Sequence, residues 1–143
     1  MNFESLSVMD LFTGTGNISY EFISRGVQKL VAVDKHPACV KFVREQFKNM
    51  HPGVFQVYST DVGLAWEPSP AGLDLIFADP PYEYQEHLKL AELVMNSNLL
   101  NAGAWFILEH PAEIDLRTVP GYVETRHYGR VYFSFFNSDF RQA

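Results

Sequence analysis

Short apolar runs alternate along the chain with stretches whose apolar residues recur at helical spacing. The runs predict buried strands at residues 6–12, 30–34, 54–58, 73–78 and 104–109. Helices are predicted between these runs, over 17–25, from Pro37 onward, and over 83–96. Their inward faces are expected to carry Ile18, Phe22 and Ile23, then Val40, Val43, Phe47 and Met50, and finally Leu88, Ala91 and Met95. This order of strands and helices indicates a parallel sheet with right-handed crossovers.

The last third of the chain has a different pattern. Residues 111–120 look irregular, and 122–127 and 130–137 predict a β-hairpin around Tyr128-Gly129. Apolar residues occupy both alternating sets of 131–136, which predicts a strand covered on both faces. We therefore expect an α/β fold with a mostly parallel, seven-stranded sheet, helices on both faces and one antiparallel strand contributed by the hairpin.

Composition sets limits on this picture. The chain has 143 residues, 47% hydrophobic and 20% charged, which is typical of one folded domain. The single cysteine, Cys39, cannot form an internal disulfide, which fits a reducing, cytoplasmic setting. No apolar run reaches the roughly 18 residues of a membrane span, and no zinc-type spacing is present. The net charge of −6 argues weakly against a broad nucleic-acid-binding face, although a basic patch can sit on an acidic domain.

A glycine turn follows the first strand. Thr13-Gly14-Thr15-Gly16 breaks the apolar run, and a helix is predicted from Asn17. Glycines let the backbone approach a ligand closely, and a new helix offers unpaired N–H groups to a carboxylate or phosphate. The alternative is a tight turn without a ligand. A dinucleotide fingerprint is disfavoured, because Ser19 stands where that motif requires a third glycine or an alanine.

Distinctive polar residues follow the other strands, and we expect them to converge at one edge of the sheet. Asp34 is placed to accept hydrogen bonds from ribose hydroxyls, or else to cap a helix. Asp61 is placed to accept a hydrogen bond from an adenine amine, or else to cap the turn that follows. Asp10 lies inside an apolar strand, so its carboxylate must be hydrogen-bonded, either to the glycine turn or to a ligand amine. Glu109 ends the fifth strand, near a target base or simply as its cap.

The sharpest local motif is Asp79-Pro80-Pro81-Tyr82, after the fourth strand. Two prolines fix the backbone of the loop, and an aromatic ring suited to stacking on a flat base follows. Hydrogen bonds from an exocyclic amine to the Asp79 carboxylate and the Pro80 carbonyl would favour a more tetrahedral nitrogen. Its lone pair could then attack the methyl group of a sulfonium donor, with orientation and electrostatics supplying the rate.

Five stretches together resemble the RsmD family, bacterial methyltransferases that modify guanine N2 in 16S ribosomal RNA. They are 8–16, 31–34, 77–82, 106–110 and 128–132, so the resemblance covers nearly the whole chain. It implies a Rossmann-like class I methyltransferase fold, S-adenosyl-L-methionine as cofactor, and 16S rRNA or the assembling small subunit as partner of a cytoplasmic monomer. It implies catalytic roles for Asp79, Pro80, Pro81 and Tyr82. The implied cofactor-binding residues are Asp10, Phe12, Thr13, Gly14, Thr15, Gly16, Asp34, Lys35, Asp61 and Val62.

One feature of that family has no counterpart in this sequence. Its members carry a basic segment before the first strand, so residues 1–143 are expected to form a single methyltransferase domain that lacks this segment. Two other readings stay open: an amino-group methyltransferase acting on DNA adenine or a protein glutamine, and a non-catalytic nucleotide-binding module. Arg126 and Arg130, near the predicted hairpin turn, are candidates for phosphate contacts, although a solvated hairpin is the default. His36 and His110 either line the crevice or, as we expect first, lie at the surface.

Overall fold

The computed structural model describes residues 3–14, 16–47, 55–59 and 72–141, and the chain divides into two compact units, Met1–Ser69 and Pro70–Ala143. Within the described residues, unit 1 contains three strands and unit 2 contains four. None of the described helices is long and apolar enough to cross a membrane.

Unit 1 is built from parallel strands in the order β3-β2-β1. Strand β1 pairs with β2 from Ser7 opposite Lys29 to Leu11 opposite Val33. Both strands are buried along almost their whole length, which is why their sequences read as continuous apolar runs. The elements of the unit are η1 (Phe3–Ser5), β1 (Ser7–Leu11), α1 (Asn17–Ser24), β2 (Lys29–Asp34), α2 (Pro37–Phe47) and β3 (Phe55–Ser59).

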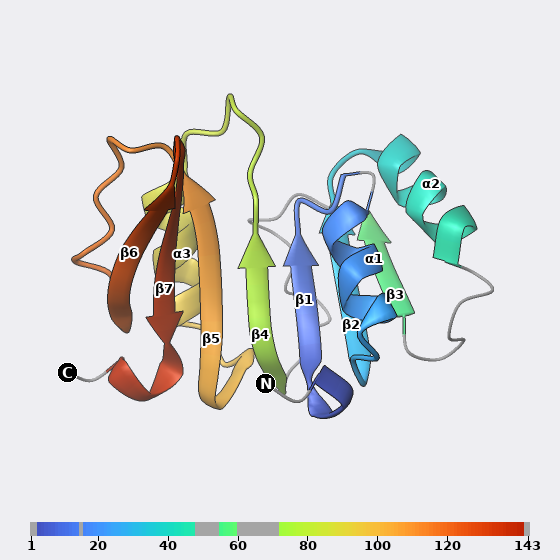
Figure 1. Cartoon of the computed structure of the whole chain (residues 1–143), viewed down its shortest axis with the longest axis horizontal. Helices are drawn as coiled ribbons and strands as arrows, with labels where there is room; N and C mark the ends of the chain where they lie inside the picture. Colours follow the sequence, from blue (N-terminus) through green and yellow to red (C-terminus); the bar gives the residue numbers. More distant parts are fainter. Residues whose placement is uncertain (1–2, 15, 48–54, 60–71, 142–143) are drawn as a thin grey trace. The chain divides into compact units, whose positions relative to one another are not determined.

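The two helices of unit 1 pack beside these strands (Figure 1). Helix α2 buries Val40, Val43 and Phe47, as its spacing predicts. Helix α1 buries Ile23 but not Ile18, which is 37% exposed, so that part of the predicted face is wrong. The inward position is taken instead by Ser19, one residue further along the helix. A polar residue in the buried stripe hid the true helical face from a reading based on apolar residues.

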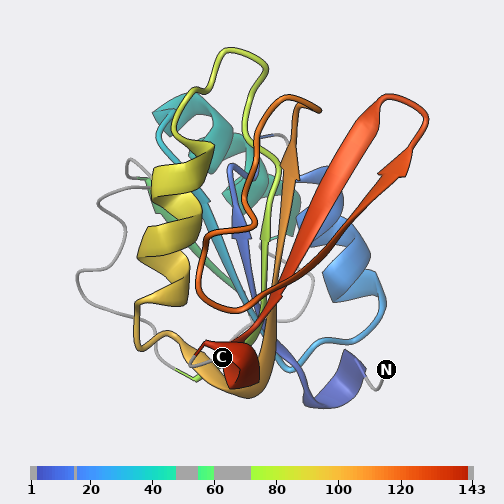
Figure 2. The same ribbon diagram turned by 90° about the vertical axis from the view of Figure 1, so that its left-hand side faces the viewer.

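Unit 2 holds four strands in the order β4-β5-β7-β6. Strands β4 and β5 are parallel, and the hairpin adds β7 antiparallel to β5, with β6 outside it. Helix α3 lies to one side of β5 (Figure 2). The elements are β4 (Leu73–Ala78), α3 (His87–Met95), β5 (Leu100–His110), β6 (Tyr122–Tyr128), β7 (Val131–Asn137) and η3 (Ser138–Phe140).

Helix α3 begins four residues later than predicted. Residues 83–86 carry no apolar stripe and extend the preceding loop instead. The buried face is His87, Leu90, Ala91, Val94 and Met95. Leu88, predicted to face inward, is 42% exposed because it lies outside this longer stripe.

Strand β7 is covered less evenly than its apolar pattern predicts. Ser134 and Phe136 are buried, whereas Phe133 and Phe135 are half-buried and Val131 is exposed. The hairpin turn falls at Gly129-Arg130, one residue beyond the predicted position. Its tip thus presents side chains of mixed character near the carboxyl end of β5, where Glu109 pairs with Phe133 and His110 with Tyr132.

Candidate functional site

The glycine loop is residues 12–16, and its described residues, 12–14 and 16, leave β1 in an unusual backbone conformation. Gly14 has a φ of 56° and Gly16 a φ of 85°, the region that glycine adopts without strain. Phe12 also has a positive φ, 60°, which costs a residue with a side chain about 1–2 kcal/mol. A side chain on Gly16 would also place its Cβ 3.1 Å from Val43 Cγ2, whereas the space beside Gly14 is open. The loop is therefore packed against α2 at Gly16 and accessible at Gly14.

Asp10 anchors this loop to helix α1. Its carboxylate accepts hydrogen bonds from the hydroxyls of Thr13 at 3.0 Å and Ser19 at 2.7 Å, and all three side chains are buried. The hydroxyls of Thr13 and Ser19 lie 3.1 Å apart. The expectation that a buried Asp10 must be hydrogen-bonded is confirmed, with the glycine loop as its partner. Sequence reasoning missed Ser19 as the second partner, although a serine in the first turn after a glycine loop was the available signal.

Asp34 fastens the other side of the glycine loop. Its carboxylate accepts the backbone N–H of Gly14 and that of His36, each at 2.9 Å. The Thr13 N–H also donates to the Val33 carbonyl, so β2 holds the loop through two adjacent residues. Each carboxylate oxygen keeps a second lone pair, which leaves Asp34 able to accept a ligand hydroxyl.

The structure thus brings the predicted cofactor-binding residues of unit 1 together around one loop. Asp10, Thr13, Gly14, Gly16 and Asp34 belong to a single hydrogen-bonded and packed arrangement. Phe12 lies in that loop, and Lys35 follows Asp34 with an exposed side chain. Three of the predicted residues, Thr15, Asp61 and Val62, lie outside the described part of the chain.

The proline loop, residues 79–82, follows β4 in unit 2. Its turn is closed by a hydrogen bond from the Tyr84 N–H to the Pro81 carbonyl, 2.9 Å. Asp79 is exposed and the Tyr82 side chain is fully exposed, with a relative accessibility of 101%. A rigid loop therefore presents a carboxylate and an unstacked aromatic ring to solvent.

The proline loop forms one wall of a cavity of about 830 Å³ that lies wholly within unit 2. The unit 2 cavity is lined by residues 79–85, His87, 109–114 and 130–131. The carboxyl ends of β4 and β5 and the tip of the hairpin lie at the same end of this unit (Figure 1). His110, for which a surface position was the first expectation, is instead buried and lines this cavity.

Asp79 and Glu109 meet in the cavity wall. Ala78 and Leu108 are register partners in parallel strands, so the residues that follow them, Asp79 in the proline loop and Glu109 near the end of β5, lie side by side. Burial, a hydrogen bond to the Asp79 carboxylate and the charge of Asp79 together raise the pKa of Glu109 to about 8. Glu109 therefore holds a proton at neutral pH. Glu109 lies beside the proline loop and one residue before the end of β5, so it is not the cap of that strand, and its nearness to a target base stays a prediction.

His87 was missed by sequence reasoning. Its side chain is 4% exposed, lines the cavity, and its Nδ1 finds no hydrogen-bond partner in the part of the chain that the structure describes. Burial and the nearby His110 lower the pKa of His87, against the opposing charge of Glu113, so the ring is neutral at pH 7. An unsatisfied buried polar atom costs about 1–3 kcal/mol, and a ligand atom in the cavity would satisfy it.

His110 behaves differently, because both of its ring nitrogens are engaged. Nδ1 lies 2.8 Å from the Pro111 carbonyl and must donate to it, so Nε2, 2.7 Å from the Ser134 hydroxyl, accepts. Burial lowers the pKa of His110, opposed by the Pro111 hydrogen bond and the charge of Glu113. The chain of hydroxyls continues from Ser134 to Thr125, 2.8 Å, and to Tyr122, 2.6 Å. This network fixes the β5 end of the cavity to the hairpin.

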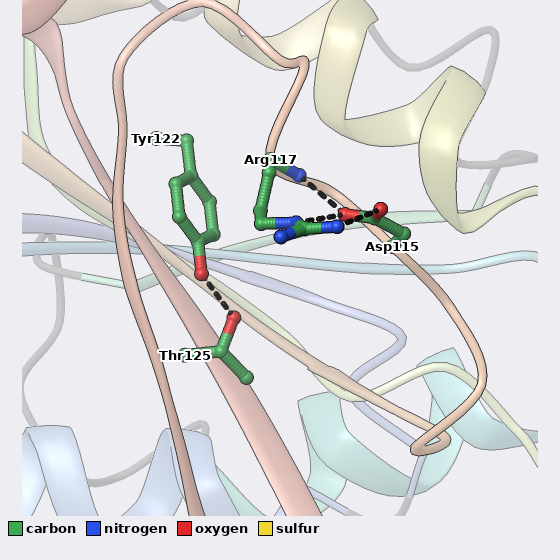
Figure 3. A network of polar contacts seen from close by, with 4 residues as sticks. All are labelled: Asp115, Arg117, Tyr122 and Thr125. Carbon is green, nitrogen blue, oxygen red and sulfur yellow. Dashed lines mark hydrogen bonds and ion pairs between the residues drawn. The ribbon is translucent and has the colours of Figure 1, made fainter.

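The segment between β5 and β6 has its own clamp, shown in Figure 3 beside the Tyr122–Thr125 contact. Arg117 donates from Nε and a terminal nitrogen to the Asp115 carboxylate, at 3.0 and 2.9 Å, and the Arg117 backbone N–H donates to it as well, at 3.1 Å. The Arg117 hydrogen bonds lower the pKa of Asp115 to about 2. The residues that follow the cavity wall are thus locally ordered.

Few positively charged side chains stand around the cavity to bind a polyanion. Arg130 lines it, whereas Arg126 is paired with Glu124 and stacks its guanidinium over the Phe135 ring, 5.4 Å from the centroid. Among the residues that the structure describes, no group of three or more His, Cys, Asp or Glu side chains is arranged to hold a metal ion.

The sequence matches a known protein family and a Bacillus subtilis protein. The protein family described as "Conserved hypothetical protein 95" matches residues 1–137. The Bacillus subtilis (strain 168) protein named "Putative rRNA methyltransferase YlbH" is 31% identical over 123 residues, which are 82% of this chain and 67% of that protein.

Two solved structures show the same fold. The Escherichia coli structure titled "Putative methyltransferase yhhF" superposes with a TM-score of 0.79 at 20% identity, covering 92% of this chain and 75% of that one. An RNA methyltransferase from Salinibacter ruber, in complex with S-adenosyl-L-homocysteine, gives a TM-score of 0.72 at 16% identity, covering 95% and 82%. The predicted class I methyltransferase fold, mostly parallel with an antiparallel C-terminal hairpin, is confirmed.

Proposed function

This chain belongs to the family described as "Conserved hypothetical protein 95", and we propose that it is an S-adenosyl-L-methionine-dependent methyltransferase acting on a guanine N2 amine of 16S ribosomal RNA. The observation that carries the proposal is the proline loop. It offers a carboxylate, rigid carbonyls and an unstacked ring at the wall of a cavity of about 830 Å³. The name of the Bacillus subtilis relative supports an RNA substrate, and the Salinibacter ruber structure supports the cofactor.

The residues of unit 1 fit such a cofactor. Among the residues that the structure describes, a Cβ added to Gly14 would meet only the Phe12 carbonyl, 4.0 Å away, so the backbone here is open to a close approach. Gly14 and Gly16 would border the methionine end, with Asp10 and Thr13 holding the loop in shape. Asp34 would accept the ribose hydroxyls, beside Lys35, and Asp61 and Val62 would flank the adenine. When bound, this cofactor supplies an electrophilic methyl group on a sulfonium sulfur.

The residues of unit 2 would prepare the acceptor nitrogen. Its lone pair is delocalised into the base, and N–H donation to the Asp79 carboxylate and the Pro80 carbonyl favours a more tetrahedral nitrogen. The Tyr82 ring stacks on the base and aligns its nitrogen with the methyl group. This orientation of the reacting groups supplies most of the rate enhancement. After transfer, the Asp79 carboxylate takes the proton that the nitrogen loses. Arg130 supplies a cation for a flanking phosphate.

Isotope transfer tests the proposal. The protein is incubated with methyl-labelled S-adenosyl-L-methionine and, in separate reactions, unmodified 16S rRNA, assembling small subunits, duplex DNA and a glutamine-containing protein extract. Digestion and mass analysis should find N2-methylguanosine in the rRNA or the subunits. Methyladenine in DNA or methylglutamine in protein would contradict the substrate. Binding of S-adenosylhomocysteine without any transfer would favour a non-catalytic nucleotide-binding module.

A further inference from the structure

Asp79 and Glu109 form a pair that the fold sets up. They follow register partners of two parallel strands, Ala78 of β4 and Leu108 of β5, so neither depends on a long loop for its position. Both line the unit 2 cavity and their side chains share a hydrogen bond. Two adjacent carboxyls cannot both ionise easily, so such a pair retains one proton between them.

We propose that Glu109 is the positioning residue of Asp79, and that the protonated pair reads a base edge on which an amine N–H stands beside a ring N–H. Glu109 donates its proton to one Asp79 oxygen. The second Asp79 carboxylate oxygen accepts the amine N–H. The C=O oxygen of the Glu109 side-chain carboxyl accepts the ring N–H. This inference rests on the proposed function and deepens it by naming the group that selects the base.

The donor pattern of the bases makes this edge selective. Guanine carries its N2 amine next to N1–H, so it meets the two outward acceptors without disturbing the Asp79–Glu109 hydrogen bond. Adenine and cytosine carry the amine next to a bare ring nitrogen, whose lone pair would face the Glu109 carbonyl oxygen. To bind either base, Glu109 would have to turn its proton away from Asp79. One mismatched hydrogen bond of this kind lowers binding by about 10- to 100-fold.

The surroundings of Glu109 keep the proton in place. Strand β7 puts the apolar Phe133 opposite it. The ionisable and charged groups that line the same cavity are Asp79, Tyr82, Glu83 and Tyr84 of the β4–α3 loop, His87 of α3, His110 and Glu113 after Glu109, and Arg130 of the hairpin. Both histidines are held neutral by burial, while Glu83 and Glu113 add negative charge. Burial, followed by the hydrogen bond and charge of Asp79, raises the pKa of Glu109 to about 8.

Two substitutions at Glu109 test whether its side chain acts as a hydrogen-bond donor to Asp79. Glu109→Ala should lower the single-turnover rate on unmodified rRNA at pH 7 by about 10- to 100-fold, the worth of a hydrogen bond to a charged group. Glu109→Gln should rescue most of that loss, because an amide keeps one donor for Asp79 and one outward carbonyl. Wild-type turnover should also fall as the pH rises through about 8, where Glu109 ionises, and Glu109→Gln should abolish that fall.

The matched control is Glu92→Gln, an exposed glutamate of α3 that lies outside the cavity lining. It should change neither the rate at pH 7 nor the fall through pH 8. S-adenosylhomocysteine affinity and urea unfolding, measured on every variant, exclude misfolding. If Glu109→Gln is as slow as Glu109→Ala, or if the wild-type rate is flat from pH 7 to 9, the inference is wrong.

A second measurement needs no turnover, so it separates this inference from the proposed function. The Glu109 carboxyl is followed by ¹³C NMR in the free protein. Its pKa should lie above 7 and fall in Asp79→Asn, which removes the neighbouring charge. Guanosine monophosphate should shift the Glu109 resonance, whereas adenosine monophosphate and 1-methylguanosine, which lack a ring N–H at that position, should not. Equal shifts with all three would overturn the inference even if the protein methylates guanine, and selective shifts would support it even if the protein methylates nothing.

Discussion

In unit 1 the acidic side chains beside the glycine loop are hydrogen-bonded by the protein itself, whereas in unit 2 those beside the proline loop face a cavity. Asp10 binds two hydroxyls and Asp34 binds two backbone N–H groups. Asp79 and Glu109, by contrast, bind each other at the wall of an open space. The first arrangement fixes the path of the backbone, and the second leaves polar atoms for a substrate.

The difference extends to the neighbouring residues. Around the glycine loop, Gly16 packs against α2 and Ser19 is fully buried. Around the proline loop, Tyr82 is fully exposed, and the buried Nδ1 of His87 has no partner among the described residues. Unsatisfied groups persist in a folded protein when the surrounding structure compensates for their cost, and they mark places where a ligand binds. We therefore expect substitutions in the two loops to separate binding of the cofactor from turnover.

The largest effect should come from Asp79→Ala. Removing a pre-placed charged acceptor from a reacting group costs about 10²- to 10³-fold in rate, so most single-turnover activity should disappear. Affinity for S-adenosylhomocysteine, measured by calorimetry, should stay within a few-fold of wild type, because unit 1 keeps all its contacts. An equal loss of both would show that the proline loop serves the cofactor alone and would remove the contrast between the loops.

Asp34→Ala should show the opposite pattern. Loss of a hydrogen bond to a charged group should weaken S-adenosylhomocysteine binding by about 1.5–3 kcal/mol. The control is Asp139→Ala, because Asp139 also accepts a backbone N–H, that of Gly103 at 2.9 Å, but lies in unit 2. It should leave that affinity unchanged. If both variants bind the ligand as well as wild type, Asp34 only shapes the loop.

Gly16→Ala tests how far the glycine loop depends on packing. The φ of 85° strains any side chain, and the new Cβ would lie 3.1 Å from Val43 Cγ2 and 3.3 Å from a Phe47 ring carbon. We expect a loss of about 1–3 kcal/mol in the free energy of unfolding, measured by urea titration. Gly129→Ala is the matched control, with a φ of 64° and no atom of the described residues within 4 Å of the new Cβ, and it should cost only the strain. Equal losses would mean that the packing against α2 adds nothing.

Most helices and strands could be predicted from local patterns of apolar residues. The positions of the glycine loop and the proline loop could be predicted from their glycines and prolines. The strand, glycine turn and helix from residue 7 to 24 form as predicted because buried parallel strands need continuous apolar runs and the turn needs glycine. The predicted start of α3 was wrong because residues 83–86 have no apolar stripe at helical spacing to bury. Leu88 was misplaced because the longer stripe through Leu90 and Val94 determines which face is buried.

Pairings between distant side chains could not be predicted. The roles of Glu109 and Asp79 depend on the register between β4 and β5, which sets Ala78 opposite Leu108, and neither strand's own pattern names its partner residue. Ser19 reaches Asp10 only because α1 starts at Asn17 and turns its third residue inward. His87 looked like an ordinary helix residue, since its burial comes from the packing of α3. In the proposed function these pairings carry the chemistry, so the proline loop predicts where a site lies but not how its side chains interact.

The smallest expected effect is on stability, and it tests whether the pair in the cavity wall holds its proton. Glu109 keeps its proton up to about pH 8 in the folded protein, whereas an ordinary glutamate ionises near pH 4.5. Between these values the folded state binds one proton more than the unfolded state, so the free energy of unfolding should decrease as the pH rises from 4.5 to 8. The decrease should be modest because the group is partly exposed and screened by solvent.

Urea unfolding at several pH values should show a steeper decline for wild type than for Glu109→Gln, while Glu92→Gln should follow wild type. Parallel profiles for wild type and Glu109→Gln would mean that the two carboxyls of unit 2 do not share a proton. The contrast with the internally bonded carboxylates of unit 1 would then rest on exposure alone.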